Sequence, residues 1–120
     1  MSYDINLCDP ITKEVLLLDH PHFMRGGTYA LYGTCELWLN VTYNYGEIFR
    51  RPDVLGKDGI RAIYGMTGAE SIPVLKKAAS ALKDDVDPDY RKATEGNSKR
   101  PLLQLIAMAQ MRPDGIWDGD

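Results

Sequence analysis

The segment 20–28 carries the most versatile side chains for chemistry in this sequence, with His20, His22, Arg25 and Thr28 close together around paired glycines. Arg25 can donate two parallel hydrogen bonds, and a glycine-rich backbone can bring main-chain amides close to an anion. We take these four residues as ligand-binding candidates. A loop that crosses a sheet edge, with its histidines in solvent, explains the same residues. Two histidines do not make a zinc site, and the chain has no third, so we predict no metal.

Polar side chains also recur at every second position from Glu36 to Asn44. On a strand they share one face, and in a helix Glu36, Asn40 and Asn44 still lie together. A carboxylate and two amides beside the Trp38 indole suit recognition of a base or a sugar by stacking and directed hydrogen bonds. The solvated outer face of an antiparallel sheet explains the pattern equally well. Glu36, Trp38, Asn40 and Asn44 are therefore candidates with two open interpretations.

Tyrosines crowd the same half of the chain, at positions 29, 32, 43, 45 and 64. Tyrosine combines apolar area with a polar tip, so it lines pockets and interfaces. Tyr43 and Tyr45 adjoin the polar face and join the candidate list. Half-buried tyrosines of an ordinary sheet account for the crowding as well.

The sequence shows no recognisable set of nucleophile, base and acid. Residues 65–71 resemble a phosphate loop only superficially, because they lack the Gly-Lys-Ser/Thr ending. These observations favour a binding protein without a cofactor. The alternative is a small enzyme acting on a nucleotide or phosphoester, with His20 or His22 as general acid/base, Arg25 as anion clamp and Glu36 as orienter or second base.

Alternating apolar and polar residues predict the strands that must position these groups. Residues 3–7 and 15–18 form a first predicted hairpin, and 28–32 with 36–43 form a second, with 20–27 as a loop between them. The spacing of Glu36, Asn40 and Asn44 leaves a helix as the competing interpretation of residues 36–45.

The second half of the sequence favours helices. A short helix is expected at 47–51, and an apolar stripe predicts one at 71–82 with Ser71 as its N-cap, although Thr67 could also cap this entry. A last helix begins near Asn97 or Ser98, tolerates Pro101 in its first turn and ends before Pro113. Hairpins followed by helices indicate an α+β fold, with N-terminal antiparallel β-hairpins packed against C-terminal helices in a single domain, 1–120.

Composition limits the classes of function. A net charge of −3 argues against a nucleic-acid binder with a broad basic surface, although the pairs Arg50-Arg51 and Lys99-Arg100 are locally basic. Two cysteines are too few for a disulfide scaffold, and neither a signal peptide nor a membrane span is evident. We expect a cytoplasmic protein with free thiols and no membrane partner.

Several motifs together resemble those of small proteins encoded by tailed phages and prophages. The motifs are Asp9-Pro10, Arg25-Gly26-Gly27-Thr28, the segment 39–45, the segment 63–73, which begins Ile63-Tyr64-Gly65-Met66, and the segment 111–120, which begins Met111-Arg112-Pro113-Asp114. The resemblance spans nearly the whole chain and implies a phage accessory protein in the host bacterial cytoplasm, without assigning an activity to any residue.

We therefore predict a phage-encoded protein that binds a host or defence protein, or a small nucleotide-like ligand. A structural virion component is a further alternative, and a homodimer could form through a sheet edge or the apolar helices.

Overall fold

The computed structural model describes residues 1–22 and 33–120 and has an α+β fold, as the sequence predicts. In chain order the elements are β1 (Ser2–Cys8), β2 (Leu17–His22), β3 (Thr34–Glu36), β4 (Trp38–Thr42), the 3₁₀ helix η1 (Tyr43–Tyr45), α1 (Gly46–Phe49), the 3₁₀ helix η2 (Gly59–Ile63), α2 (Gly68–Ser80), α3 (Glu95–Met111) and β5 (Ile116–Gly119).

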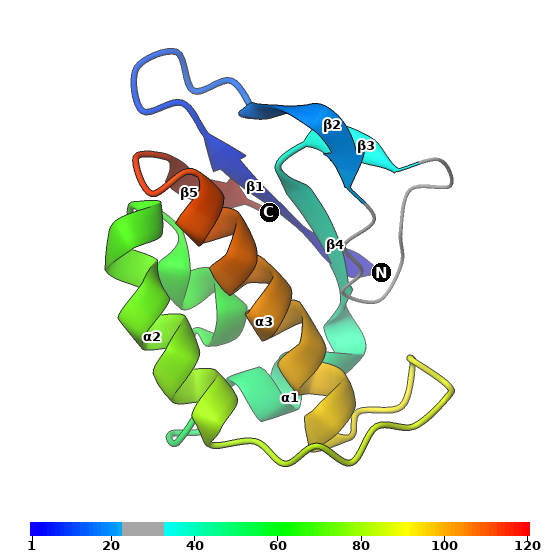
Figure 1. The fold of residues 1–120 in the computed structure, drawn as a ribbon. Helices are drawn as coiled ribbons and strands as arrows, with labels where there is room; N and C mark the ends of the chain where they lie inside the picture. The colour runs from blue at the N-terminus through cyan, green and yellow to red at the C-terminus, as the bar shows by residue number, and fades with distance from the viewer. Residues whose placement is uncertain (23–32) are drawn as a thin grey trace.

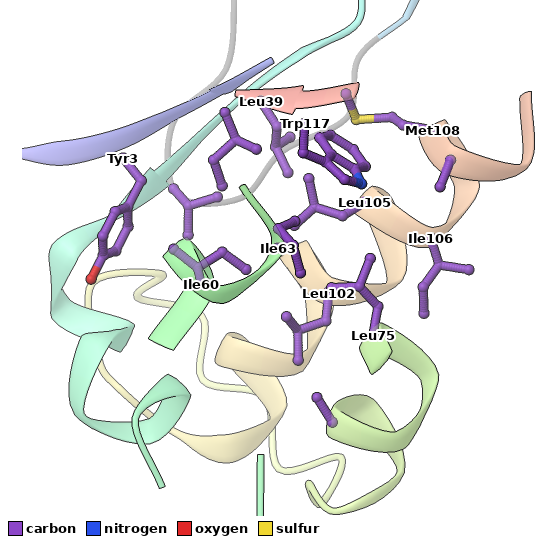
Figure 2. Packing of buried hydrophobic residues seen from close by; sticks show 14 of the residues in the cluster. Tyr3, Leu39, Ile60, Ile63, Leu75, Leu102, Leu105, Ile106, Met108 and Trp117 are labelled. Atoms are coloured by element: carbon purple, nitrogen blue, oxygen red, sulfur yellow. The ribbon is translucent and has the colours of Figure 1, made fainter. Parts of the chain in front are cut away.

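The main sheet has three antiparallel strands in the order β4-β1-β5, so β1 is central. Alternation along β1 places Tyr3, Ile5 and Leu7 on one face, where Ile5 lies opposite Leu39 and Leu7 opposite Trp117. Helices α2 and α3 run side by side in opposite directions beneath this face (Figure 1). The core between the two layers is where Trp117 meets the side chains of α3 (Figure 2).

A second sheet pairs only β2 with β3, and its register shifts between Leu17 and His22. The predicted hairpin of 3–7 with 15–18 is reduced to one isolated bridge between Cys8 and Val15, because β1 uses both edges for β4 and β5. His20, Pro21 and His22, expected in a loop, lie in β2. A two-stranded irregular ladder tolerates the proline because few of its N–H groups are needed for pairing. The predicted strand 28–32 lies outside the described residues.

The competing interpretations of residues 36–45 are resolved in favour of a strand over Trp38–Thr42. The strand ends where the Thr42 hydroxyl accepts a hydrogen bond from the N–H of Asn44 and begins η1. Residues 43–45 therefore turn away from the strand direction, and Asn44 leaves the polar face on which alternation had placed it.

Both long helices begin earlier than the periodicity of their apolar residues indicated. Thr67 caps α2 in a capping box, in which its hydroxyl accepts from the Glu70 N–H and the Glu70 carboxylate accepts from the Thr67 N–H. Thr94 caps α3 without a reciprocal bond, because its hydroxyl accepts from the Asn97 N–H. Ser71 lies one turn inside α2 and is fully buried. Within the described part of the chain, no helix has the length and apolar character needed to cross a membrane.

Candidate functional site

The outer face of the main sheet holds a hydrogen-bonded network centred on Asp4. Its Oδ1 accepts from the indole Nε1 of Trp38 at 3.1 Å and from the amide Nδ2 of Asn40 at 2.9 Å. Asn40 also donates to the Ser2 hydroxyl at 2.7 Å. Cross-strand register brings these groups together, because Asp4 lies opposite Asn40. The amides and the indole predicted to bind a ligand thus have partners within the sheet itself.

The histidine candidates lie on the smaller sheet. His20 is exposed, whereas the half-buried His22 ring donates from Nε2 to the main-chain oxygen of Glu36 across the β2–β3 ladder. Glu36 is exposed at the end of β3. Arg25 and Thr28 lie outside the described residues, so the predicted convergence of His20, His22, Arg25 and Glu36 on one site stays a prediction.

Asn44 and Tyr45 anchor a distant loop rather than lining the sheet face. The Asn44 side-chain amide donates to the main-chain oxygen of Arg91 at 2.9 Å. The hydroxyl of the buried Tyr45 donates to the main-chain oxygen of Tyr90. Both contacts tie η1 to the segment between α2 and α3. The predicted candidates thus lie in separate parts of the molecule, and a ligand-binding role for Asn44 and Tyr45 stays a prediction.

Tyr43, the remaining candidate, lines an open pocket of about 290 Å³ with Tyr3, Arg50 and Arg61. These residues come from η1, β1, the C-terminal cap of α1 and η2, respectively. The Tyr3 ring closes the edge of the core and its hydroxyl points away from the apolar cluster, toward the short helices (Figure 2). We call this site the arginine–tyrosine pocket.

The two phenol rings orient Arg61. Tyr3 and Tyr43 pack edge to face, with ring centroids 4.5 Å apart. The guanidinium carbon of Arg61 lies 5.0 Å from the centroid of Tyr3 and 5.9 Å from that of Tyr43, within the range of cation–π attraction. Its Nε donates to the main-chain oxygen of Asp120 at 2.7 Å. Stacking and this hydrogen bond fix the side chain and leave the two terminal nitrogens for other acceptors.

Arg50 reaches the pocket past two glycines. Its Cγ would lie 3.2 Å from a Cβ on Gly59, and its Nη1 would lie 2.9 Å from a Cβ on Gly46. The Tyr3 hydroxyl is also 2.9 Å from that Gly46 position. The missing side chain of Gly46 therefore provides the space in which the guanidinium and the hydroxyl approach each other.

The adjacent Arg51 behaves differently from Arg50, although the sequence presents them as one basic pair. Arg51 donates to both carboxylate oxygens of Asp53, at 3.0 and 2.6 Å, and to Glu95 at 3.0 Å. These hydrogen bonds raise the pKa of Arg51, and its charge is paired with Asp53 and Glu95 within the protein. Among the described residues, no side-chain carboxylate forms an ion pair with Arg50 or with Arg61.

Sequence reasoning missed Arg61 and Tyr3 as site residues. Tyr3 was assigned only to the buried face of a strand, and Arg61 lay in a segment whose secondary structure was left open. The signals that were present are the basic pair at Arg50 and the tyrosine crowding around Tyr43. Neither indicates that β1 and η2 meet.

The described residues contain no cluster of three or more histidine, cysteine, aspartate or glutamate side chains that could hold a metal ion. Cys8 and Cys35 are free thiols, and burial is the main cause that raises the pKa of Cys8. Comparison of the chain with protein-family models, with curated proteins and with solved structures finds no match.

Proposed function

We propose that this protein is a non-catalytic binding protein that recognises a small anionic ligand in the arginine–tyrosine pocket. The observation that carries the proposal is the convergence of two guanidinium groups and two phenols on one open pocket, with Arg50 lacking a carboxylate partner among the described residues. Arginines at a surface usually extend into solvent or form ion pairs. Here Arg61 is oriented by Tyr3, Tyr43 and the main-chain oxygen of Asp120, as a preorganised anion site requires, and Arg50 lies beside Gly46 and Gly59 with its side chain exposed.

The residue types of the lining favour binding over turnover. Phenols and guanidinium groups are poor general bases near neutral pH, because they ionise near pH 10 and above pH 12. The lining formed by the described residues offers no thiol, imidazole or carboxylate as a nucleophile or base. The motif resemblance supports a setting in the bacterial cytoplasm, where such a protein would act as a phage accessory factor for a nucleotide-like ligand.

Isothermal titration calorimetry with citrate, inorganic phosphate and adenosine 5′-monophosphate tests this function. At least one probe should bind with one-to-one stoichiometry and be recovered chemically unchanged. Arg50→Ala and Arg61→Ala should each weaken that binding tenfold or more, since a charge-assisted hydrogen bond contributes about 1.5–3 kcal/mol.

Arg91→Ala is the matched control, because Arg91 is an exposed arginine paired with Asp89 outside the pocket lining. Failure of all three probes to bind would contradict the proposed function. Binding that survives in the Arg50→Ala/Arg61→Ala double variant would place the ligand elsewhere.

A host protein remains the second candidate for a partner, favoured by the fixed orientation of Trp38. Its indole N–H is held by Asp4 while the side chain stays half-exposed on the outer sheet face. Exposed, rigid tryptophan is typical of interface anchors. A pull-down from bacterial lysate that depends on Trp38 but not on Arg61 would identify this second surface.

A further inference from the structure

We infer that the group recognised in the arginine–tyrosine pocket is a terminal phosphate, the dianionic phosphomonoester of a small molecule such as a nucleoside monophosphate. The inference rests on the proposed function and names the chemistry of its ligand. It is argued from the hydrogen-bonding groups, from the charges of the surrounding elements and from the shape of the pocket.

The polar ends of the lining match the oxygens of a phosphate. Guanidinium groups only donate hydrogen bonds, and phenol hydroxyls can donate as well as accept. Arg50 Nη1 and the Tyr3 hydroxyl approach each other beside Gly46, and Arg61 covers the same Tyr3 ring. Donors that come from several elements suit a tetrahedral group with three terminal acceptor oxygens better than a planar carboxylate, which presents only two.

Charge also favours a dianion. Arg50 and Arg61 contribute two positive charges to the lining. The nearby Asp120 carboxylate accepts from the main-chain N–H of Asp4 at 2.9 Å, and the Asp4 carboxylate accepts from Trp38 and Asn40. Within the described residues, neither of these side-chain carboxylates forms an ion pair with Arg50 or Arg61. Glu47, on α1, is exposed. A phosphomonoester carries about two negative charges above its second pKa, near 6, whereas a diester carries one at any neutral pH.

The shape of the pocket favours the end of a small molecule over a polynucleotide backbone. A volume of about 290 Å³ accommodates a phosphate with part of the attached group. The net charge of −3 disfavours a broad basic surface, and Arg51, next to the pocket residue Arg50, is engaged by Asp53 and Glu95. A backbone binder would need several phosphate contacts in a row.

The test compares adenosine 5′-monophosphate with adenosine, 3′,5′-cyclic adenosine monophosphate and inorganic phosphate, by calorimetry and by amide shifts in NMR spectra of the ¹⁵N-labelled full chain. We expect the monophosphate to bind at least tenfold more tightly than the cyclic diester, with adenosine not binding. The amides of Tyr3, Tyr43 and Gly46 should shift. Binding of inorganic phosphate alone would show that the nucleoside adds nothing and would limit the inference to free phosphate.

The pH dependence gives a second readout that a general charge effect would not reproduce. Affinity for the monophosphate should be about tenfold weaker at pH 5 than at pH 7.5, following the loss of the dianion. The cyclic diester does not titrate in this range, so the ratio of the two affinities isolates ionisation of the ligand from that of protein groups such as Glu47, Asp4, Asp120 and the α-amino group of Met1.

Arg50→Lys and Arg61→Lys keep the charge but lose the planar fork, and each should weaken monophosphate binding at least threefold with an unchanged unfolding midpoint. Equal affinity for the diester and the monoester, or binding of citrate alone, would overturn the phosphate inference while leaving the proposed function intact. If no anion binds, both the phosphate inference and the proposed function are contradicted.

Discussion

The indole N–H of Trp117 donates a hydrogen bond of 2.7 Å to the hydroxyl oxygen of Ser71, and both side chains are almost completely buried. The Ser71 hydroxyl in turn donates to the main-chain oxygen of Gly68 at 2.8 Å. One hydroxyl thus satisfies the only polar atom of the largest core side chain and joins β5 to α2. These hydrogen bonds connect the sheet layer to the helix layer through Trp117 and Ser71.

Replacing Ser71 by alanine should destabilise the protein by about 1–3 kcal/mol, because the indole N–H would remain buried without an acceptor. Urea denaturation followed by tryptophan fluorescence measures the change. Ser80→Ala is the matched control: its hydroxyl bonds to the Lys77 carbonyl on the exposed side of the same helix, and its loss should change stability by less than about 0.5 kcal/mol. Equal losses in the two variants would contradict the role assigned to Ser71.

Two tyrosines should respond in opposite directions to loss of the hydroxyl. The Tyr64 oxygen is buried beside Gly119 without a hydrogen-bond partner among the described residues, and burial is the main cause that raises its pKa. Tyr64→Phe should therefore leave stability unchanged or raise it by up to about 1 kcal/mol. Tyr45→Phe should lower stability by about 1 kcal/mol, since that hydroxyl donates to the Tyr90 carbonyl. Thermal unfolding of both variants decides the sign.

The capping box of α2 should contribute stability that depends on pH. The main-chain N–H of Thr67, followed by its hydroxyl, lowers the pKa of the Glu70 carboxyl from 4.5. The folded state therefore binds the proton less tightly than the unfolded state. The contribution is complete above pH 4.5 and is lost as the pH falls through the lower pKa of the folded protein.

Glu70→Gln should consequently lose less stability than the wild type when the pH falls from 6 to 3, as measured by urea denaturation at each pH. Glu47→Gln provides a control on an exposed carboxylate of α1. Parallel stability profiles for the wild type and Glu70→Gln would show that the capping box adds nothing to the pH dependence.

The strands that could be predicted from the sequence are those with one buried face. The alternation of apolar and polar residues at 3–7 and 38–42 predicts burial directly, because every second side chain enters the same core. The strand β5 has four residues, Ile116–Gly119, and its position depends on pairing with β1 from the other end of the chain. A segment that short shows no period, so only tertiary structure identifies it.

The helix caps illustrate a different difficulty. Thr67 and Ser71 are both suitable N-cap residues, and the spacing Thr67-x-x-Glu70 favours the first. Apolar periodicity favoured the second, because the first turn of α2 packs through Gly68 and Ser71 rather than through large apolar side chains. In that first turn a buried hydroxyl, that of Ser71, makes the tertiary contact, so the sequence shows no large apolar residue there.

The arginine–tyrosine pocket was beyond prediction for a topological reason. Tyr3 is distant in the sequence from Arg50 and Arg61. The three meet because β1 is central in the sheet and the chain after β4 folds back as short helices beneath its end. Local patterns carry no information on that path. Composition around Arg50 and Tyr43 nevertheless indicated the residue types from which the site is built.

Gly46→Ala should separate the effect of the pocket on ligand affinity from its effect on the stability of the fold. Gly46 has φ −58° and ψ −41°, a helical conformation that alanine adopts with less loss of backbone entropy than glycine. The added Cβ would lie 2.9 Å from Arg50 Nη1 and 2.9 Å from the Tyr3 hydroxyl. Arg50 Nη1 is the far end of a flexible side chain and can move without displacing the backbone. The Tyr3 ring is buried and packs on Tyr43, so its hydroxyl has less room to move and offsets part of the gain from alanine.

We therefore expect Gly46→Ala to unfold within about 1 kcal/mol of the wild type while binding of adenosine 5′-monophosphate weakens at least fivefold. Combining it with Arg50→Ala tests the cause, because the methyl group then has less to displace and the two losses of affinity should be less than additive. Calorimetry on the four proteins of this double-mutant cycle gives the coupling. Full additivity would mean that Gly46 does not act through Arg50, and an unchanged affinity in Gly46→Ala would remove the space beside Gly46 from the binding site.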